Sequence, residues 1–325
     1  MGLESRSGAR SGGEGMKRGA ALLVLLLASC ATPQSVPGPL LAITIDDVPV
    51  HAPYPPGTTA NAVNAQMIAA LTAEHVPAMA FFNGIGIERQ PETMNGLEQW
   101  RAAGLVVGNH TWSHRHLSEM TRAEFEAEVS RNEPILGRIG GGSDWRWFRY
   151  PFLDEGENAA KRVAGRQALA KHGYRVAAVT MSFSDWQWTA PYARCSGVRD
   201  DAAVAELERL YLASAKENAA AARDTSRKLY GRDIPYVLLM HVSAMSAHMM
   251  PQLLRLYRDA GFRFVSLADA ERDPSYREYT DLSLAPPPSP WDVAAKKGVQ
   301  IPVATDYSAK LAAMCPGGGA AVSSP

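Results

Sequence analysis

The feature that most constrains the fold is an unbroken alternation of strand-like and helix-like segments between residues 40 and 267. Short apolar runs bounded by turn residues predict buried strands, and longer runs with apolar residues at helical spacing predict helices. Elements that alternate in this way form a parallel sheet covered by helices, and such regularity favours closure into a barrel. The predicted strands cover residues 40–45, 78–83, 105–108, 145–150, 174–181, 236–241 and 262–267.

The helices predicted between these strands include one that opens with a Thr-Arg-Ala-Glu capping box at Thr121 and a long one capped by Asp200 or Asp201. The alternation stops after Asp273. Proline at 286–288 and glycine at 317–319 predict an irregular tail over residues 274–325 that wraps the domain or stays mobile. The predicted helices cover residues 61–75, a short segment ending near 104, and residues 121–139, 157–172, 200–230 and 247–260.

The N-terminus has the pattern of a secretory signal. A basic start at Met16-Lys17-Arg18 precedes an apolar run that is too short to span a bilayer. The run ends at Leu27-Ala28-Ser29-Cys30, which resembles the lipobox of bacterial lipoproteins, with Cys30 acylated. We therefore expect residues 1–30 to be a signal peptide (residues 1–15 a mis-called start) and residues 31–39 a tether. The mature protein is then expected in the cell envelope, on the periplasmic face of the outer membrane.

A plain signal peptide with an incidental Cys30 is the alternative. Cys195 and Cys315 could pair in an oxidising compartment, but sequence does not supply the geometry and their pairing stays open. The chain has 33 basic and 33 acidic side chains, so it lacks the basic excess of a nucleic-acid binder. No protein partner can be inferred.

Reactive side chains collect where the predicted strands end. Because (β/α) enzymes build their sites from the loops at the carboxyl ends of parallel strands, we expect one catalytic face. In chain order these residues are Asp46 and Asp47, His110 and His114, Arg149 and Pro151, Asp185 and Trp186, and His241.

One carboxylate and two histidines from this set predict a metal site. Asp, His and His suit Zn²⁺ and leave a position open for water, although Co²⁺ or Mn²⁺ would also fit. His110 and His114 stand four residues apart, so a helical turn or a tight loop can aim both at one ion. Adjacent carboxylates at Asp46 and Asp47 are costly without a cation. Neighbours on a strand point in opposite directions, so we expect one to ligate the metal and the other to act as a base.

Five motifs in this order resemble those of the polysaccharide deacetylase family (the NodB-homology domain, carbohydrate esterase family 4). The resemblance covers roughly residues 40–267, and it implies a distorted (β/α) barrel with about seven parallel strands. We therefore expect residues 40–273 to be the deacetylase domain. The matching segments are Thr44-Ile45-Asp46-Asp47-Val48-Pro49, His110-Thr111-Trp112-Ser113-His114, Arg149-Tyr150-Pro151-Phe152, Asp185-Trp186 and Leu238-Leu239-Met240-His241.

The resemblance also implies a role for each residue. Asp46 would be the general base and His241 the general acid, with Asp47, His110 and His114 as metal ligands. Arg149 would hold Asp46, and Asp185 would tune His241. Pro151 and Phe152 would wall the groove, the Phe152 backbone N–H would bind the oxyanion, and Trp186 and Leu238 would line the acetyl pocket.

The expected reaction is removal of acetyl from an N-acetylated amino sugar of an envelope or extracellular glycan. The alternatives are an esterase for O-acetylated polysaccharide such as xylan, a ring-amide hydrolase, and a non-catalytic glycan-binding lipoprotein. Val48 stands where the family has glycine, and residues 190–235 form an insertion, so the groove is expected to differ from that of relatives. His51, His116 and His248 are interpreted as ordinary loop histidines.

Overall fold

The computed structural model describes residues 38–140, 142, 144–284 and 289–316. Within them, seven strands pair in parallel, as expected for an α/β fold. The strands are β1 (Leu40–Val48), β2 (Met79–Phe82), β3 (Val106–Asn109), β4 (Trp147–Phe148), β5 (Arg175–Val176), β6 (Tyr236–His241) and β7 (Arg263–Phe264).

The strands follow one another around the sheet in the order β5-β4-β3-β2-β1-β6. The chain beyond β5 then returns to β6 through a parallel bridge between Met181 and Leu238. β7 pairs with the beginning of β1, where Leu40 lies opposite Arg263. The strands therefore curl into a distorted (β/α) barrel, which confirms the predicted fold class.

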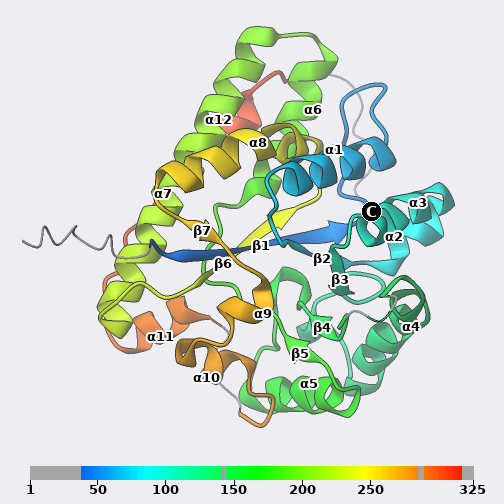
Figure 1. The fold of residues 1–325 in the computed structure, drawn as a ribbon, viewed down its shortest axis with the longest axis vertical. Helices are drawn as coiled ribbons and strands as arrows, with labels where there is room; N and C mark the ends of the chain where they lie inside the picture. The colour runs from blue at the N-terminus through cyan, green and yellow to red at the C-terminus, as the bar shows by residue number, and fades with distance from the viewer. Residues whose placement is uncertain (1–37, 141, 143, 285–288, 317–325) are drawn as a thin grey trace, which may run out of the picture. The chain divides into compact units, whose positions relative to one another are not determined.

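Helices surround these strands (Figure 1). The α-helices are α1 (Ala60–Ala73), α2 (Gly84–Arg89), α3 (Met94–Ala102), α4 (Arg122–Gly140), α5 (Ala159–Lys171), α6 (Thr189–Gly197), α7 (Asp201–Tyr230), α8 (Ala244–Asp259), α9 (Leu267–Ala270), α10 (Arg277–Thr280), α11 (Pro290–Lys296) and α12 (Ser308–Ala313). The 3₁₀ turns are η1 (Pro91–Thr93), η2 (Leu117–Glu119), η3 (Pro151–Leu153), η4 (Asp185–Trp188) and η5 (Pro274–Tyr276).

Local sequence explains where several helices begin. The predicted capping box forms, because the Glu124 backbone N–H donates to the Thr121 hydroxyl and the Thr121 backbone N–H donates to the Glu124 carboxylate. Asp200 caps α7 by accepting from the Ala203 N–H. Side-chain acceptors at helix N-termini satisfy backbone donors that have no partner within the helix.

The central strand β1 is buried along almost its whole length, in agreement with its continuous apolar sequence. A parallel barrel strand packs against helices on its outer face and against other side chains inside the barrel, so it has no solvent side and shows no alternation of polar and apolar residues. The main core includes Ile43 and Ile45 of β1, Leu254 of α8 and Tyr211 of α7. This packing fixes the position of β1 and therefore of the residues at its carboxyl end.

Strands four and five are shorter than predicted. Only Trp147 and Phe148 of residues 145–150, and Arg175 and Val176 of residues 174–181, form regular ladders. The residue after each short ladder still makes one backbone hydrogen bond to the neighbouring strand. The Arg149 N–H donates to the Asn109 carbonyl, and the Ala177 N–H donates to the Phe148 carbonyl. None of the described helices is long and apolar enough to cross a membrane.

The described residues beyond 273 pack against the barrel through short helices. Leu311 of α12 is buried in the main core, and the Arg194 guanidinium donates to the Leu311 and Met314 carbonyls. Cys195 of α6 forms a disulfide with Cys315, which closes a loop with a sequence separation of 120 residues. The pairing left open by the sequence is thus present in the structure.

We expect this disulfide to stabilise the fold, because a crosslink between distant residues restricts the unfolded chain. Cys315→Ser should lower the free energy of unfolding by about 2–5 kcal/mol, measured by denaturant titration. Dithiothreitol should destabilise the wild-type protein by a similar amount and leave Cys315→Ser unchanged. Equal stability of the two proteins under oxidising conditions would contradict the expectation.

Candidate metal centre and active site

The barrel brings the predicted reactive residues to one end of the strands. Asp46 and Asp47 lie in the last residues of β1, and His241 is the last residue of β6, directly opposite Asp46 in register. His110 follows β3, Arg149 follows β4, and Asp185 begins η4 after β5. All are at carboxyl ends of strands, as the sequence predicted.

Asp47, His110 and His114 form a group that could hold a metal ion, with ligand atoms within 4.8 Å of one another. The His114 Nε2 atom is 3.3 Å from Asp47 Oδ1, and the His110 Nε2 atom is 3.6 Å from the same oxygen. The two histidines come from a tight loop, not a helical turn: Thr111 and His114 have φ angles of 60° and 56°.

The donor atoms fit a divalent cation. Asp47 Oδ1 is buried without any hydrogen-bond partner, which is costly unless a cation is its partner. The His110 Nδ1 atom lies 2.7 Å from the Arg149 carbonyl oxygen; a proton on Nδ1 would leave the Nε2 lone pair free for a metal. Burial lowers the pKa of His110 and His114 to about 4, so both rings are neutral near pH 7. Two neutral imidazoles and one carboxylate suit zinc.

The backbone of β1 places Asp46 and Asp47 on the same side, contrary to the expectation that they point in opposite directions. Asp47 has a left-handed φ of 63°, and the register with β2 shifts between Ile45 and Val48. The His110 Nε2 atom is 3.6 Å from an oxygen of each carboxylate. The prediction assumed regular strand alternation, and the irregularity at Asp47 breaks that alternation.

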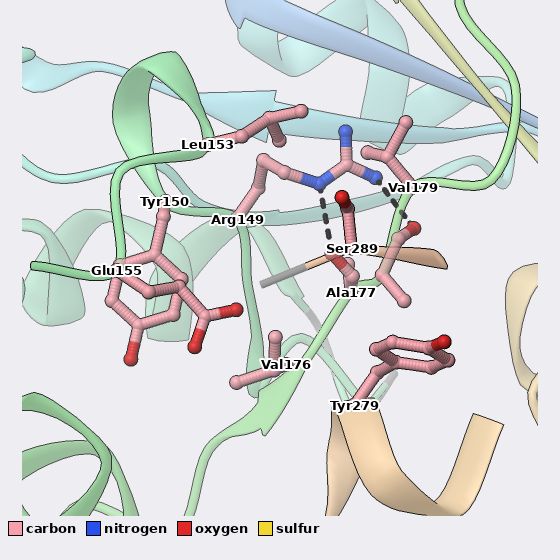
Figure 2. A pocket seen from close by; sticks show the side chains of 10 residues that line it. Arg149, Tyr150, Leu153, Glu155, Val176, Ala177, Val179, Tyr279 and Ser289 are labelled. Carbon is pink, nitrogen blue, oxygen red and sulfur yellow. Dashed lines mark hydrogen bonds between the residues drawn. The ribbon is translucent and has the colours of Figure 1, made fainter. Parts of the chain in front are cut away.

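Asp46 is held by Arg149, and both side chains are buried. The Arg149 Nη1 atom lies 3.3 Å from each Asp46 oxygen. Figure 2 shows the guanidinium also directed toward Ala177, whose carbonyl accepts from Arg149 Nε at 2.9 Å. Burial raises the pKa of Asp46 to about 6, although the charge of Arg149 opposes that rise. The carboxylate is therefore a stronger base than an exposed aspartate and is still ionised at neutral pH.

His241 is paired with Asp185. The Nδ1 atom of His241 is 2.8 Å from Asp185 Oδ1, and its backbone N–H donates to Asp185 Oδ2 at 2.8 Å. The Ser246 hydroxyl donates to the same Oδ2 at 2.7 Å. Burial alone would lower the pKa of His241, but the charge and hydrogen bond of Asp185 raise it to about 9. The ring is protonated at neutral pH.

A cavity of about 830 Å³ is lined by Asp47 and His114 of the candidate metal group. Phe152 and Trp186 line it and are 56% and 53% exposed. Leu238 is fully buried in the core and is not among the residues that line this cavity; nor is Pro151. Contact of Leu238 and Pro151 with substrate stays a prediction. Cys30 lies outside the described residues.

Two residues of this region were missed or misinterpreted from the sequence. His51, interpreted as an ordinary loop histidine, lines the cavity and has its Nδ1 atom 2.7 Å from Asp47 Oδ2. No role was predicted for Ser246, whose hydroxyl donates to Asp185 from α8. The spacing of four residues between Asp47 and His51 was a signal in the sequence, whereas nothing local marked Ser246.

Comparison with known proteins identifies related sequences. Residues 34–177 match the sequence model of the polysaccharide deacetylase family. A peptidoglycan-N-acetylglucosamine deacetylase from Bacillus cereus is 30% identical over 91 residues, which are 28% of this chain and 32% of the relative. Chitin deacetylase 2 from Saccharomyces cerevisiae is 28% identical over 92 residues, 27% of this chain and 28% of the relative. The matched segment thus spans about a third of each curated relative.

Solved structures share the fold at low sequence identity. A CE4 family pseudoenzyme from Bacillus anthracis is 13% identical, with a TM-score of 0.50 over 72% of this chain and 66% of that chain. The matched segment contains β1 to β5 and, within it, the paired carboxylates, both histidines of the metal group and Arg149. Over residues 34–177 the chain is thus similar to the polysaccharide deacetylase family.

Proposed function

We propose that this protein is a metal-dependent deacetylase that removes acetyl groups from N-acetylated amino sugars of a polysaccharide. The observation that carries the proposal is the placement of Asp46, held by Arg149, opposite His241, held by Asp185. Asp46, with a pKa raised to about 6, is ionised near neutral pH, while His241, with a pKa raised to about 9, is protonated. A base and an acid in register across β1 and β6 are what amide hydrolysis requires.

The chain's own residues account for the proton transfers. Asp46 takes a proton from the water that attacks the acetyl carbonyl carbon, and Arg149 keeps its carboxylate in place. His241 then donates a proton to the sugar nitrogen as the carbon–nitrogen bond breaks, which yields acetate and a free amine. Asp185 favours the protonated form of His241 by charge and by hydrogen bonding.

Asp47, His110 and His114 would hold the metal, with Zn²⁺ the ion best suited to the donor set and Co²⁺ or Mn²⁺ as alternatives. When bound, the metal supplies Lewis-acid polarisation of the carbonyl and activation of water. The backbone N–H of Phe152 is proposed as a donor to the oxyanion, and the exposed ring of Trp186 as a surface for the sugar.

Two alternatives follow from the same site. An esterase acting on O-acetylated polysaccharide would use the same base and ligands, because both reactions transfer an acetyl group to water. A non-catalytic glycan-binding protein would not need Asp46 and His241 in opposite protonation states, and the retention of both groups favours catalysis. The matched relatives are named as deacetylases of peptidoglycan N-acetylglucosamine and of chitin, which supports an amide substrate.

We test the activity by acetate release from N-acetylglucosamine oligomers, peptidoglycan and acetylated xylan. The metal-stripped protein should be inactive on all three, and Zn²⁺ should restore release from the two N-acetylated substrates. Asp46→Asn should retain Zn²⁺ but lose at least about 100-fold in kcat, because a general base typically contributes that much or more. Release from xylan alone would select the esterase, and Zn²⁺ binding without release from any substrate would favour the binding protein.

We expect the rate to fall as pH rises through the pKa of His241, near 9, because the general acid is then lost. Asp185→Asn removes the charge that raises this pKa, so the alkaline limb of the kcat profile should move to lower pH. Ser246→Ala is the matched control, since it removes a hydrogen bond to Asp185 but keeps the charge. An alkaline limb that stays in place in Asp185→Asn would exclude His241 as the titrating acid.

We also propose that the protein is anchored by a lipid on Cys30, in the cell envelope at the periplasmic face of the outer membrane. The signal-like residues 16–30 and the lipobox-like end of that run support this localisation. Labelled palmitate should be incorporated into the wild-type protein and not into Cys30→Ser. Label that persists in Cys30→Ser would overturn the anchor.

A further inference from the structure

His51 is joined to a predicted metal ligand by a short hydrogen bond. Its Nδ1 atom lies 2.7 Å from Asp47 Oδ2, and the two side chains are 19% and 13% exposed. Asp47 is an acceptor only, so the proton in this bond belongs to His51 Nδ1. The contact is made four residues along the chain, in the loop that leaves β1.

The two oxygens of Asp47 therefore have different environments. Oδ2 accepts from His51, whereas Oδ1 is buried, has no hydrogen-bond partner and lies 3.3 Å from His114 Nε2. Each carboxylate oxygen has two lone pairs, but the His51 bond holds the carboxylate in one orientation, in which Oδ1 is the oxygen without a hydrogen-bond partner. The hydrogen bond thus selects which oxygen faces the two histidines.

The loop that contains His51 is fixed at its base. The buried Asn64 side-chain amide donates to the Pro49 carbonyl at 2.8 Å, and the Trp100 indole N–H donates to the Asn64 oxygen at 2.7 Å. The His51 backbone N–H donates to the Tyr54 hydroxyl at 3.1 Å. These bonds hold the imidazole beside Asp47 instead of leaving it free in solvent.

His51 also contacts the proposed acid. Its ring lies against the His241 ring, with centroids 4.9 Å apart, and it lines the cavity above Asp47. It is not part of the Asp47, His110 and His114 group, whose ligand atoms are mutually within 4.8 Å. His51 is therefore placed to hydrogen-bond the predicted ligand Asp47 and not to bind the metal itself.

We propose that His51 is a positioning residue that donates to Asp47 Oδ2 and so aims Oδ1 at the metal. The inference rests on the proposed function only in assigning Asp47 as a metal ligand. Hydrogen-bonded neighbours of metal ligands typically affect metal affinity by about 10–100-fold when they are removed, because the ligand then loses its orientation. His51 should therefore act on metal affinity first and on turnover only through the metal.

The test is the zinc dissociation constant, measured by competition with a chromophoric chelator and without substrate. His51→Ala should weaken Zn²⁺ binding by about 10–100-fold. His51→Asn should recover most of the affinity, because its amide nitrogen sits at the same distance along the side chain as Nδ1 and can donate to Oδ2. With Zn²⁺ saturating, turnover of His51→Asn should return toward the wild-type value.

His248→Ala is the matched control. His248 is also a histidine bonded to a carboxylate, Glu208, at 2.7 Å, but it does not line the cavity. Its removal should leave the zinc dissociation constant unchanged. If His51→Ala lowers protein stability too far for measurement, comparison of His51→Asn with His51→Leu gives the same contrast between a donor and no donor.

The outcomes separate this inference from the proposed function. A His51→Ala protein that is folded and binds Zn²⁺ as tightly as wild type overturns the positioning role. Absence of acetate release from every substrate, with zinc affinity dependent on His51, would overturn the deacetylase proposal and support the inference. A wild-type protein that binds no divalent ion overturns both.

Discussion

The buried Arg149 is the interaction on which the rest of the site depends. Its guanidinium pairs with Asp46 and donates to the Thr44 hydroxyl on β1, and it also donates to the Ala177 carbonyl beyond β5. Its backbone carbonyl lies within hydrogen-bond distance of His110 Nδ1. One residue thus connects the proposed base to a proposed metal ligand across the barrel. A buried charge is tolerated only when it is paired and hydrogen-bonded, and Arg149 satisfies both conditions.

Backbone strain is concentrated around this interaction. Of the nine described residues other than glycine that have left-handed φ angles, six lie in or next to the predicted motifs: Asp47, Thr111, His114, Phe152, Leu153 and Ser184. Each such conformation costs on the order of 1–3 kcal/mol and persists only where the surrounding structure enforces it. Here the enforcing elements are β1 in the core, the tight loop after β3 and the turn η3. The strained backbone lowers the stability of the fold, but it brings together side chains that a regular backbone would keep apart.

Burial disfavours the charged forms of both Asp46 and His241, and their charged partners oppose that effect to different extents. Asp46 is buried with Arg149 as its nearest cation, and desolvation still raises its pKa. His241 is buried against an anionic partner, and Asp185 more than compensates for desolvation. Both pKa values are therefore raised, and they leave the carboxylate ionised and the imidazole protonated at neutral pH. Solvation and charge pairing, acting on two adjacent strands, set up the acid–base asymmetry.

The sequence alone determined the order of elements, the barrel class and the motifs at strand ends, because apolar periodicity and short sequence motifs can be recognised within a few neighbouring residues. The convergence of Asp46, His110, Arg149 and His241 could be predicted, since the carboxyl ends of parallel strands lie at one edge. Tertiary structure decided the rest. The irregular backbone turns Asp47 to the same side as Asp46. Tertiary packing places His51 beside Asp47 and Ser246 beside Asp185. It also buries Leu238 and brings Cys195 to Cys315. These outcomes depend on distances between segments far apart in the chain or on irregular backbone, neither of which local periodicity encodes.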